Sequence, residues 1–77
     1  MTSSQCRAGR ALIDWTQPTL AEAASLGLST VVDFERQRRR VSDDAIADMR
    51  RALEAAGVEF TNGKRPGVRL RPRIRKL

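Results

Sequence analysis

Histidine is absent from this 77-residue sequence, and cysteine occurs only once, as Cys6. Without histidine, a Cys/His zinc site and imidazole-based acid–base catalysis are both impossible. A single cysteine cannot form an internal disulfide, which excludes the cross-linked framework of small secreted domains. The sequence also has no nucleophile–base pair and no glycine-rich phosphate loop. We therefore expect a protein that is not an enzyme and that needs no metal and no cofactor.

Aromatic residues and long apolar runs are also scarce. The aromatic residues are Trp15, Phe34 and Phe60, so the core must consist mainly of Ala, Leu, Val and Ile. A chain of this length can form one small core. No apolar run approaches the ~20 residues that cross a bilayer, and the N-terminus lacks the features of a signal peptide. We expect a cytoplasmic protein with no membrane partner.

Positive charge is concentrated near the C-terminus, although the net charge is only +6. Residues 1–63 contain eight arginines and nine acidic residues, whereas residues 64–77 contain seven basic residues and no acid. Clustered arginine in a basic chain favours a polyanionic partner, most often nucleic acid. A solubilising tail without a specific partner is the alternative. The body contains one further basic cluster, formed by Arg36, Arg38, Arg39 and Arg40.

Apolar periodicity and capping residues predict four helices. We expect these helices at about residues 4–14, 17–24, 28–36 and 43–56. The predicted N-terminal caps are Ser3 or Ser4 for the first helix, Thr16 for the second and Ser42 for the fourth. Gly57 is a natural stop for the fourth helix.

After Gly57 the apolar pattern alternates, which is typical of strands. Segments 58–60 and 68–70 flank an Asn62-Gly63 turn signal and predict a β-hairpin. We therefore divide the chain into a helical domain (residues 1–57), a hairpin extension (58–71) and a flexible basic tail (72–77). In an extended chain, four arginines of this region would share one side: Arg69, Arg71, Arg73 and Arg75.

Two short helices joined by a tight turn, the second with a small polar outward face, form the helix-turn-helix pattern. The segment LAEAASLGLSTVVDFER (residues 20–36) resembles the core signature of the lambda-repressor-like, or Xre, family of bacterial and phage regulators. The flanking segments WTQ (15–17) and RR (38–39) resemble the entry to that family's second helix and the exit from its recognition helix. The resemblance covers about residues 6–60. It implies a mainly α, four-helix lambda-repressor-like domain.

The last part of the chain resembles a compact subgroup of this family that adds a basic strand to the fourth helix. GVEF (residues 57–60) and GVRL (67–70) carry this resemblance. The sequence departs from the family pattern at three positions that shape the backbone. Ser25 and Gln37 stand where glycine is usual, and Gly27 stands where a capping Ser or Thr is usual.

The resemblance, together with the basic cluster, assigns roles to individual residues. Arg10 and Glu35 match a buried ion pair that ties the first helix to the recognition helix. The positions that reach base edges are Leu28, Ser29, Val32 and Asp33. The phosphate-contacting positions are Gln17, Thr30, Arg36, Arg38, Arg39 and Arg40. Among the base-contacting residues, Asp33 could accept a hydrogen bond from a cytosine amino group, although an acid near phosphates opposes binding.

These assignments predict a sequence-specific regulator of transcription, a repressor, that binds double-stranded DNA as a homodimer on a palindromic operator. The dimer surface is expected at the free edge of strand 68–70 or on the outer face of the fourth helix. A phage or mobile-element repressor and an antitoxin are equally compatible with the sequence. The alternative is a protein-interaction module. In that case Leu28 and Val32 would contact a protein, such as a toxin or another regulator, and the tail would bind an acidic partner or RNA.

Overall fold

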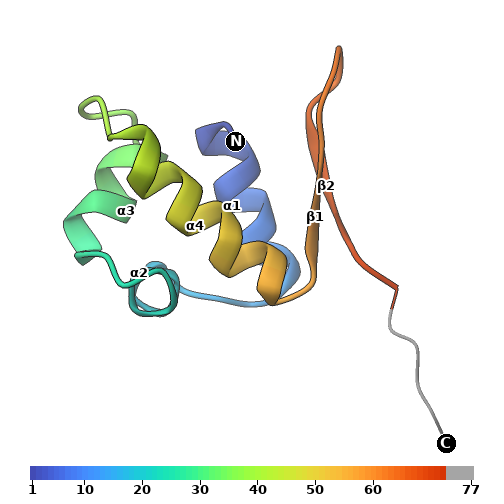
Figure 1. The fold of residues 1–77 in the computed structure, drawn as a ribbon, viewed down its shortest axis with the longest axis horizontal. Helices are drawn as coiled ribbons and strands as arrows, with labels where there is room; N and C mark the ends of the chain where they lie inside the picture. Colours follow the sequence, from blue (N-terminus) through green and yellow to red (C-terminus); the bar gives the residue numbers. More distant parts are fainter. Residues whose placement is uncertain (73–77) are drawn as a thin grey trace, which may run out of the picture.

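The structure is a computed structural model that describes residues 1–72, in which four helices precede a two-stranded antiparallel hairpin (Figure 1). The mainly α class with a C-terminal hairpin, as predicted from sequence, is confirmed at this level. The predicted positions Arg73 and Arg75 lie outside the described residues, as does the predicted tail beyond Pro72. The elements are α1 (Ser3–Leu12), α2 (Gln17–Ala23), α3 (Leu28–Glu35), α4 (Asp43–Ala55), β1 (Val58–Thr61) and β2 (Gly67–Leu70).

Side-chain caps determine where two of the helices begin. At the start of α2, Thr16 Oγ1 accepts a hydrogen bond from the N–H of Thr19 at 3.2 Å. At the start of α4, Ser42 Oγ accepts one from the N–H of Ala45, also at 3.2 Å. Each cap satisfies a backbone donor that has no partner within the helix. Both caps were predicted from sequence and are confirmed.

The predicted start of α1 is wrong. The cap is Thr2 rather than Ser3 or Ser4, and the helix ends at Leu12 rather than at residue 14. Thr2 and Gln5 form a reciprocal capping box, in which each side chain accepts a hydrogen bond from the backbone N–H of the other. This arrangement satisfies two free N–H groups, whereas a serine cap alone would satisfy one. The box therefore fixes the helix start.

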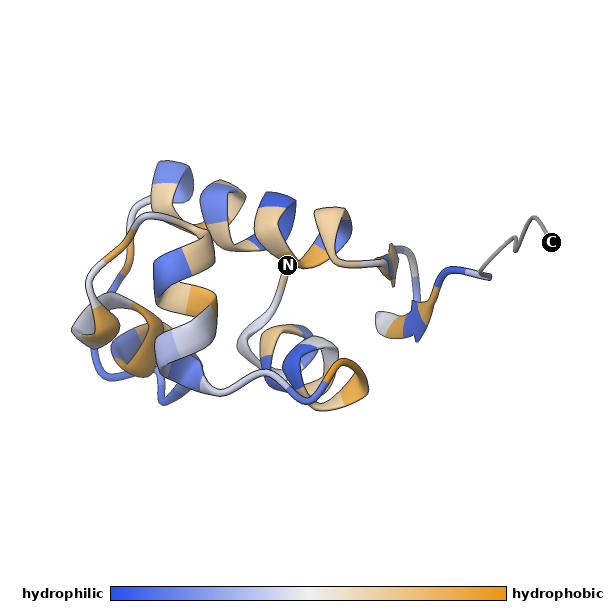
Figure 2. Ribbon diagram, turned by 90° about the horizontal axis from the view of Figure 1, so that it is seen from below, coloured by the Kyte–Doolittle hydropathy of each residue, from blue (hydrophilic) through white to orange (hydrophobic). Residues whose placement is uncertain are grey.

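The core lies between the four helices and the base of the hairpin. The three aromatic residues are only half-buried at its edge, so the core is aliphatic, as the composition predicted. In Figure 2 the hydrophilic segments of α4, which runs along the top of the view, lie on its outer side. The largest fully buried side chains are Leu20, Met49, Leu53, Glu35, Val31, Val58 and Cys6.

The hairpin is fastened to α1 by the side chain of Gln5. This side chain is buried, and its Nε2 donates to the carbonyl oxygens of Thr61 at 3.2 Å and Gly67 at 3.1 Å. Val58 also packs closely on Gly9 of α1, where a Cβ atom would lie 3.4 Å from Val58 Cγ1. One glutamine thus caps a helix and binds both strands, so the hairpin packs directly on the helices.

The register of the hairpin gives it one apolar face. Val58 lies opposite Leu70, and Phe60 lies opposite Val68, so these four side chains share a face of the sheet. The strand pairing is extended by a bond of 2.7 Å from the N–H of Arg71 to the carbonyl of Gly57. Hairpin and helices therefore share the core through this face.

Two non-glycine residues flank α3 in the left-handed backbone conformation. Ser25, in the connection from α2, has φ of 57°, and Gln37, just after α3, has φ of 55°. This conformation costs an L-residue other than glycine roughly 1–2 kcal/mol. Both residues stand at positions where the family that the sequence resembles usually has glycine. The chain therefore makes these turns without the residue best suited to them.

Replacing Ser25 by glycine should stabilise the protein. Ser25→Gly relieves the left-handed strain but adds freedom to the unfolded chain, which leaves a net gain of about 0.5–1 kcal/mol. The matched control is Ser29→Gly within α3, which should cost about 0.5–1 kcal/mol. Urea unfolding followed by circular dichroism measures both. Equal destabilisation by the two substitutions would show that the turn is not strained.

Candidate nucleic-acid interface

Helix α3 has one buried face and one open face. Val31 and Glu35 are buried against the core. Ser29 points to the opposite side and is exposed, and Leu28, the first residue of the helix, is 46% exposed. Val32 and Asp33, one turn further along, are half-buried. Of the four residues predicted to reach base edges, Ser29, Val32 and Asp33 therefore lie along the open side of α3, and Leu28 lies at its N-terminal end.

The open face lies at one end of the molecule. In Figure 1, α2 and α3 form this end, the hairpin forms the opposite end, and α1 and α4 lie between them. The four-residue connection 24–27 joins α2 to α3, and Gly27 begins α3 without a side-chain cap. The first backbone N–H groups of α3 are thus free of any capping side chain.

A buried ion pair between Arg10 and Glu35 fixes the orientation of α3. Arg10 Nε lies 2.6 Å from Glu35 Oε2, and Arg10 Nη2 lies 2.7 Å from Glu35 Oε1. The Glu35 residue is only 2% exposed. A bidentate guanidinium–carboxylate contact of this kind fixes both distance and angle between its partners. The pair therefore locks α3 onto α1.

Two further donors complete the surroundings of the Glu35 carboxylate. Gln17 Nε2, at the first turn of α2, donates to Oε1 at 3.0 Å. The Cys6 thiol of α1 donates to Oε2 at 3.1 Å. In addition, Arg7 Nη1 donates to the Glu35 backbone carbonyl at 2.5 Å. Residues from three helices therefore meet at one carboxylate.

The surroundings of Glu35 shift its pKa and that of Cys6 in opposite directions. Burial alone would raise the pKa of Glu35, but the hydrogen bonds from Arg10, Cys6 and Gln17 and the charge of Arg10 together lower the pKa below its usual value. Burial, reinforced by the hydrogen bond to Glu35, raises the pKa of the Cys6 thiol. Cys6 is therefore a protonated donor, which is the state that makes a cysteine chemically inert.

The network also engages Gln17, which was predicted to contact a DNA phosphate. One N–H of its side-chain amide is used by Glu35, and the side chain is half-buried. The amide has a second N–H, so one donor remains for another partner. Sequence reasoning missed Gln5, Cys6 and Arg7 as structural donors. The Thr2-x-x-Gln5 spacing was the signal that could have identified the first of them.

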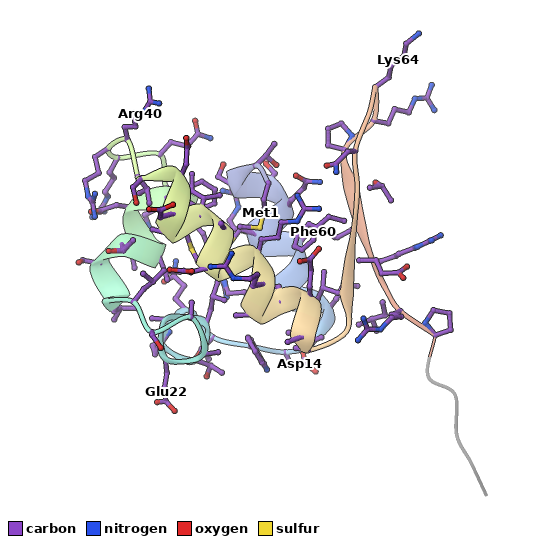
Figure 3. The ribbon with its side chains drawn as sticks, viewed as in Figure 1. Met1, Asp14, Glu22, Arg40, Phe60 and Lys64 are labelled. Carbon is purple, nitrogen blue, oxygen red and sulfur yellow. The ribbon has the colours of Figure 1, made fainter. Side chains whose placement is uncertain are left out.

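The basic cluster lies in the loop between α3 and α4. The helix ends at Glu35 rather than at residue 36, and Arg36 is its exposed C-terminal cap. Figure 3 shows Arg40 extending away from the body beside this loop. Among residues 1–72, no ion pair involves Arg36, Arg38 or Arg40. Three predicted phosphate-contacting cations thus follow the open face without an internal partner.

Arg39 differs from its neighbours because it pairs with Asp33. Its Nε lies 2.8 Å from Asp33 Oδ2, and its Nη2 lies 3.5 Å from Thr30 Oγ1. Sequence reasoning assigned Asp33 to bases and Arg39 and Thr30 to phosphates, each acting separately. The structure brings the three side chains together on α3. A contact across an irregular loop leaves no periodic signal in the sequence.

The basic residues of the hairpin are remote from α3. Arg69 pairs with Glu59 on the neighbouring strand, with Arg69 Nε 2.8 Å from Glu59 Oε1. Arg71 is exposed just after β2. Lys64 lies at the tip of the hairpin (Figure 3). These residues therefore belong to the hairpin, which lies at the opposite end of the molecule from α3 (Figure 1).

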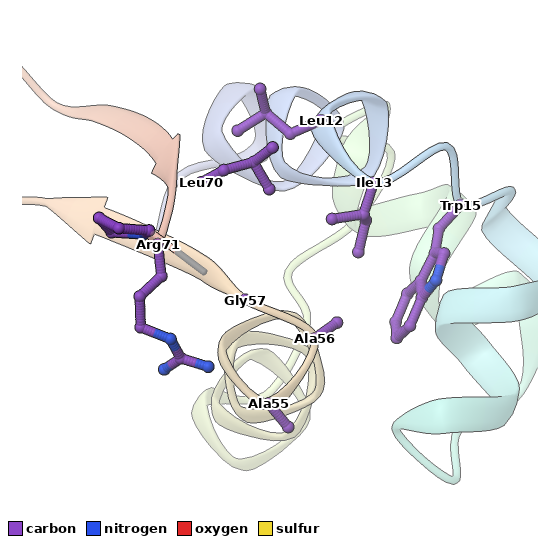
Figure 4. A pocket seen from close by; sticks show the side chains of 9 residues that line it. Leu12, Ile13, Trp15, Ala55, Ala56, Gly57, Leu70 and Arg71 are labelled. Carbon is purple, nitrogen blue, oxygen red and sulfur yellow. The ribbon is translucent and has the colours of Figure 1, made fainter. Parts of the chain in front are cut away.

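A groove of about 580 Å³, lined mostly by apolar residues, lies where the hairpin meets the helices. Leu12 of α1 and Leu70 of β2 are 38% and 50% exposed, and their side chains lie close together in Figure 4. Trp15 forms another part of the wall. The lining contains one charged residue, Arg71, and neither an acid nor a nucleophile. Among the described residues, the side chains that line the groove therefore offer mainly apolar contact.

Comparison with known proteins does not assign the chain to a family. No family model matches it, and no curated protein is significantly similar to it. In the part of the chain that the structure describes, no three His, Cys, Asp or Glu side chains come together in a way that could hold a metal ion. None of the helices in residues 1–72 has the length and apolar character needed to cross a membrane.

Replacing Glu35 by glutamine should destabilise the fold in a pH-dependent manner. Because the folded pKa of Glu35 is lowered, its contribution is present above the usual value of 4.5 and is lost as pH falls through the lower folded value. Glu35→Gln should therefore cost about 3–5 kcal/mol at neutral pH, and less in acid. Urea unfolding of both proteins at neutral and acidic pH measures this difference.

The control for this experiment is Glu59→Gln, which removes the exposed partner of Arg69. An exposed pair contributes about 0–1 kcal/mol, so this variant should remain near wild type. An equal loss for Glu35→Gln at both pH values would show that the carboxylate charge does not stabilise the fold.

Proposed function

We propose that this protein is a sequence-specific regulator that binds double-stranded DNA with α3 in the major groove. One observation carries the proposal: the open face of α3 lies at an end of the molecule, and it is followed directly by three arginines that pair with no acidic side chain among residues 1–72. An α-helix fits the width of the major groove, and cations beside it can contact the flanking phosphates. The arginines are Arg36, Arg38 and Arg40.

Three local features support a helix-turn-helix of the lambda-repressor-like kind. The pair α2–α3 consists of two short helices joined by a brief connection. The left-handed residues Ser25 and Gln37 occupy the positions at which the resembled family has glycine. Arg10 and Glu35 form the ion pair that the resemblance implies. Together these features support an orientation of α3 that is fixed before DNA binds.

The phosphate contacts would supply affinity, and α3 would supply selectivity. Each neutralised phosphate releases condensed counterions, so binding weakens as salt rises. Contacts to phosphate carry no sequence information, whereas side chains at base edges do. Leu28 and Val32 suit a thymine methyl group, and Ser29 can bond to several bases. We infer a repressor of a short operator on this basis.

A second copy of the chain is the proposed protein partner. One domain of this size offers limited contact with DNA, and two half-sites on a palindrome would double it. The groove beside β2 supports a contact surface there, because Leu12 and Leu70 are two of the three exposed large hydrophobic residues in the described chain. β2 has one edge that is not paired with β1, and its last residue, Leu70, lines the same groove.

One observation favours a second candidate function, a protein-interaction module such as an antitoxin. Leu28, the third exposed large hydrophobic residue, begins the open face of α3. A protein partner would bury this side chain as readily as a thymine methyl group would. Salt-sensitive and sequence-selective binding to duplex DNA separates the two functions.

Selection from a pool of random-sequence DNA duplexes, followed by sequencing, should yield a short palindromic motif. The triple variant Arg36→Gln, Arg38→Gln and Arg40→Gln should select the same motif with lower affinity. Its plot of log affinity against log salt should be flatter by about 0.9 for each phosphate that the variant no longer neutralises. Arg51→Gln is the control, since Arg51 lies on α4 and pairs with Asp48. The absence of any motif with the wild type would contradict the regulator and favour the protein-interaction module.

Replacing Leu70 by glutamate should weaken dimerisation without unfolding the chain. Leu70 is half-exposed in the monomer, so the charge is tolerated there but would be buried in the dimer contact. Sedimentation velocity over a range of concentrations should show a dimer for wild type and a monomer for Leu70→Glu. Leu28→Glu is the matched control at a distant exposed leucine and should remain dimeric. If the selected duplex binds one copy of the wild-type protein rather than two, the proposed homodimer is wrong.

A further inference from the structure

The pair formed by Arg39 and Asp33 differs from the free arginines beside it because α3 holds the guanidinium by one edge. Asp33 Oδ2 accepts from Nε at 2.8 Å, and Thr30 Oγ1 lies 3.5 Å from Nη2. Both partners belong to α3, whereas Arg39 comes from the loop after it. The Asp33 side chain is only 21% exposed, while that of Arg39 is 51% exposed. The anchored edge is thus sheltered, and the remainder of the guanidinium reaches solvent.

The free edge of the guanidinium has a defined chemistry. A guanidinium is planar and has five N–H donors in a rigid fork. The Nε and the adjacent side of Nη2 face α3, which leaves Nη1 and the other side of Nη2 for a ligand. Two parallel N–H donors at this spacing match O6 and N7 of guanine in the major groove, the commonest specific contact between protein and DNA.

We propose that Arg39 reads a guanine in the major groove and that Asp33 is the positioning residue that orients it. This inference rests on the proposed function and names the base that the site selects. The residues of the open face cannot themselves make a bidentate contact to guanine, because Leu28, Ser29 and Val32 lack paired donors and the Asp33 carboxylate only accepts. Asp33 therefore acts through Arg39, which also neutralises its carboxylate near the phosphates.

The neighbouring arginines lack this arrangement and provide the control. In residues 1–72 no acidic side chain pairs with Arg40, so nothing fixes the plane of its guanidinium. A side chain held in place before binding loses less conformational freedom when it meets its ligand. Arg40 suits a phosphate contact, which requires charge, whereas Arg39 suits a base contact, which requires orientation.

The test begins with the motif that wild type selects from random-sequence duplexes. Each guanine of the motif is replaced in turn by 7-deazaguanine, which lacks the N7 acceptor but still pairs with cytosine. At one position in each half-site, this replacement should lower wild-type affinity by about 5- to 150-fold, the range for a bidentate base contact. The variant Arg39→Lys keeps the charge but loses the fork, so it should be insensitive to the replacement. Arg40→Lys should respond as wild type does.

Asp33→Ala separates positioning from direct contact. The variant should show a weaker preference for guanine and a higher affinity for random duplexes, because it removes both the anchor and a negative charge. A structural role alone would lower both quantities. If Asp33 itself bound a cytosine amino group, wild type would be insensitive to 7-deazaguanine, and the inference would be wrong.

Failure of the inference differs from failure of the proposed function. A wild-type motif that is unaffected by 7-deazaguanine, or equally affected in Arg39→Lys, overturns the role of Arg39 and leaves the regulator standing. The absence of any motif overturns both. Circular dichroism of each variant shows whether it is folded. Arg39→Lys should unfold nearly as wild type does, because lysine keeps the positive charge beside Asp33 and the Arg39 side chain is 51% exposed.

Discussion

The carboxylate of Glu35 is the constraint on which the arrangement of the first three helices depends. Transferring an unpaired charge into the core would cost several kcal/mol, so the charge is tolerated only where donors surround it. Arg10 and Cys6 from α1 and Gln17 from α2 supply those donors. Since each bond has a short range and a preferred direction, the helices can satisfy the carboxylate in few relative orientations. The open face of α3 takes its direction from this buried network.

The net positive charge and the open face of α3 lie in different parts of the molecule. Residues 1–56 contain eight arginines and eight acidic residues, whereas residues 57–77 contain seven basic residues and one acid. The net positive charge therefore belongs to the chain that follows α4, while the open face of α3 lies at the other end (Figure 1). In the proposed function, the basic residues of the hairpin would attract DNA over a distance without selecting a sequence. Orientation at α3, through Arg39 and Asp33, would provide the selection.

The first residues of the helices show which features local sequence patterns can predict. The caps Thr16 and Ser42 were predictable, because each bonds a backbone N–H only three residues away. The cap of α1 was missed because Thr2, Ser3 and Ser4 are three consecutive residues that all favour the cap position, and only the Thr2-x-x-Gln5 spacing distinguishes the first of them. The left-handed backbone at Ser25 was also beyond local prediction, since serine does not favour that conformation. It is adopted where packing of α2 against α3 requires it.

The four helices, the hairpin and the basic clusters could be predicted from the amino-acid sequence, because apolar periodicity, caps and turn residues act over a few neighbouring positions. The sequence also suggested that Arg10 and Glu35 belong together, through two charges on apolar faces and the family resemblance. Three features could not be predicted before the chain was folded: Asp33 pairs with Arg39, Gln5 bonds both strands, and the hairpin lies away from α3. Such pairings join residues across irregular loops or distant elements. Which residues become partners depends on how close they lie in the folded chain, and their separation along the sequence does not reveal that distance.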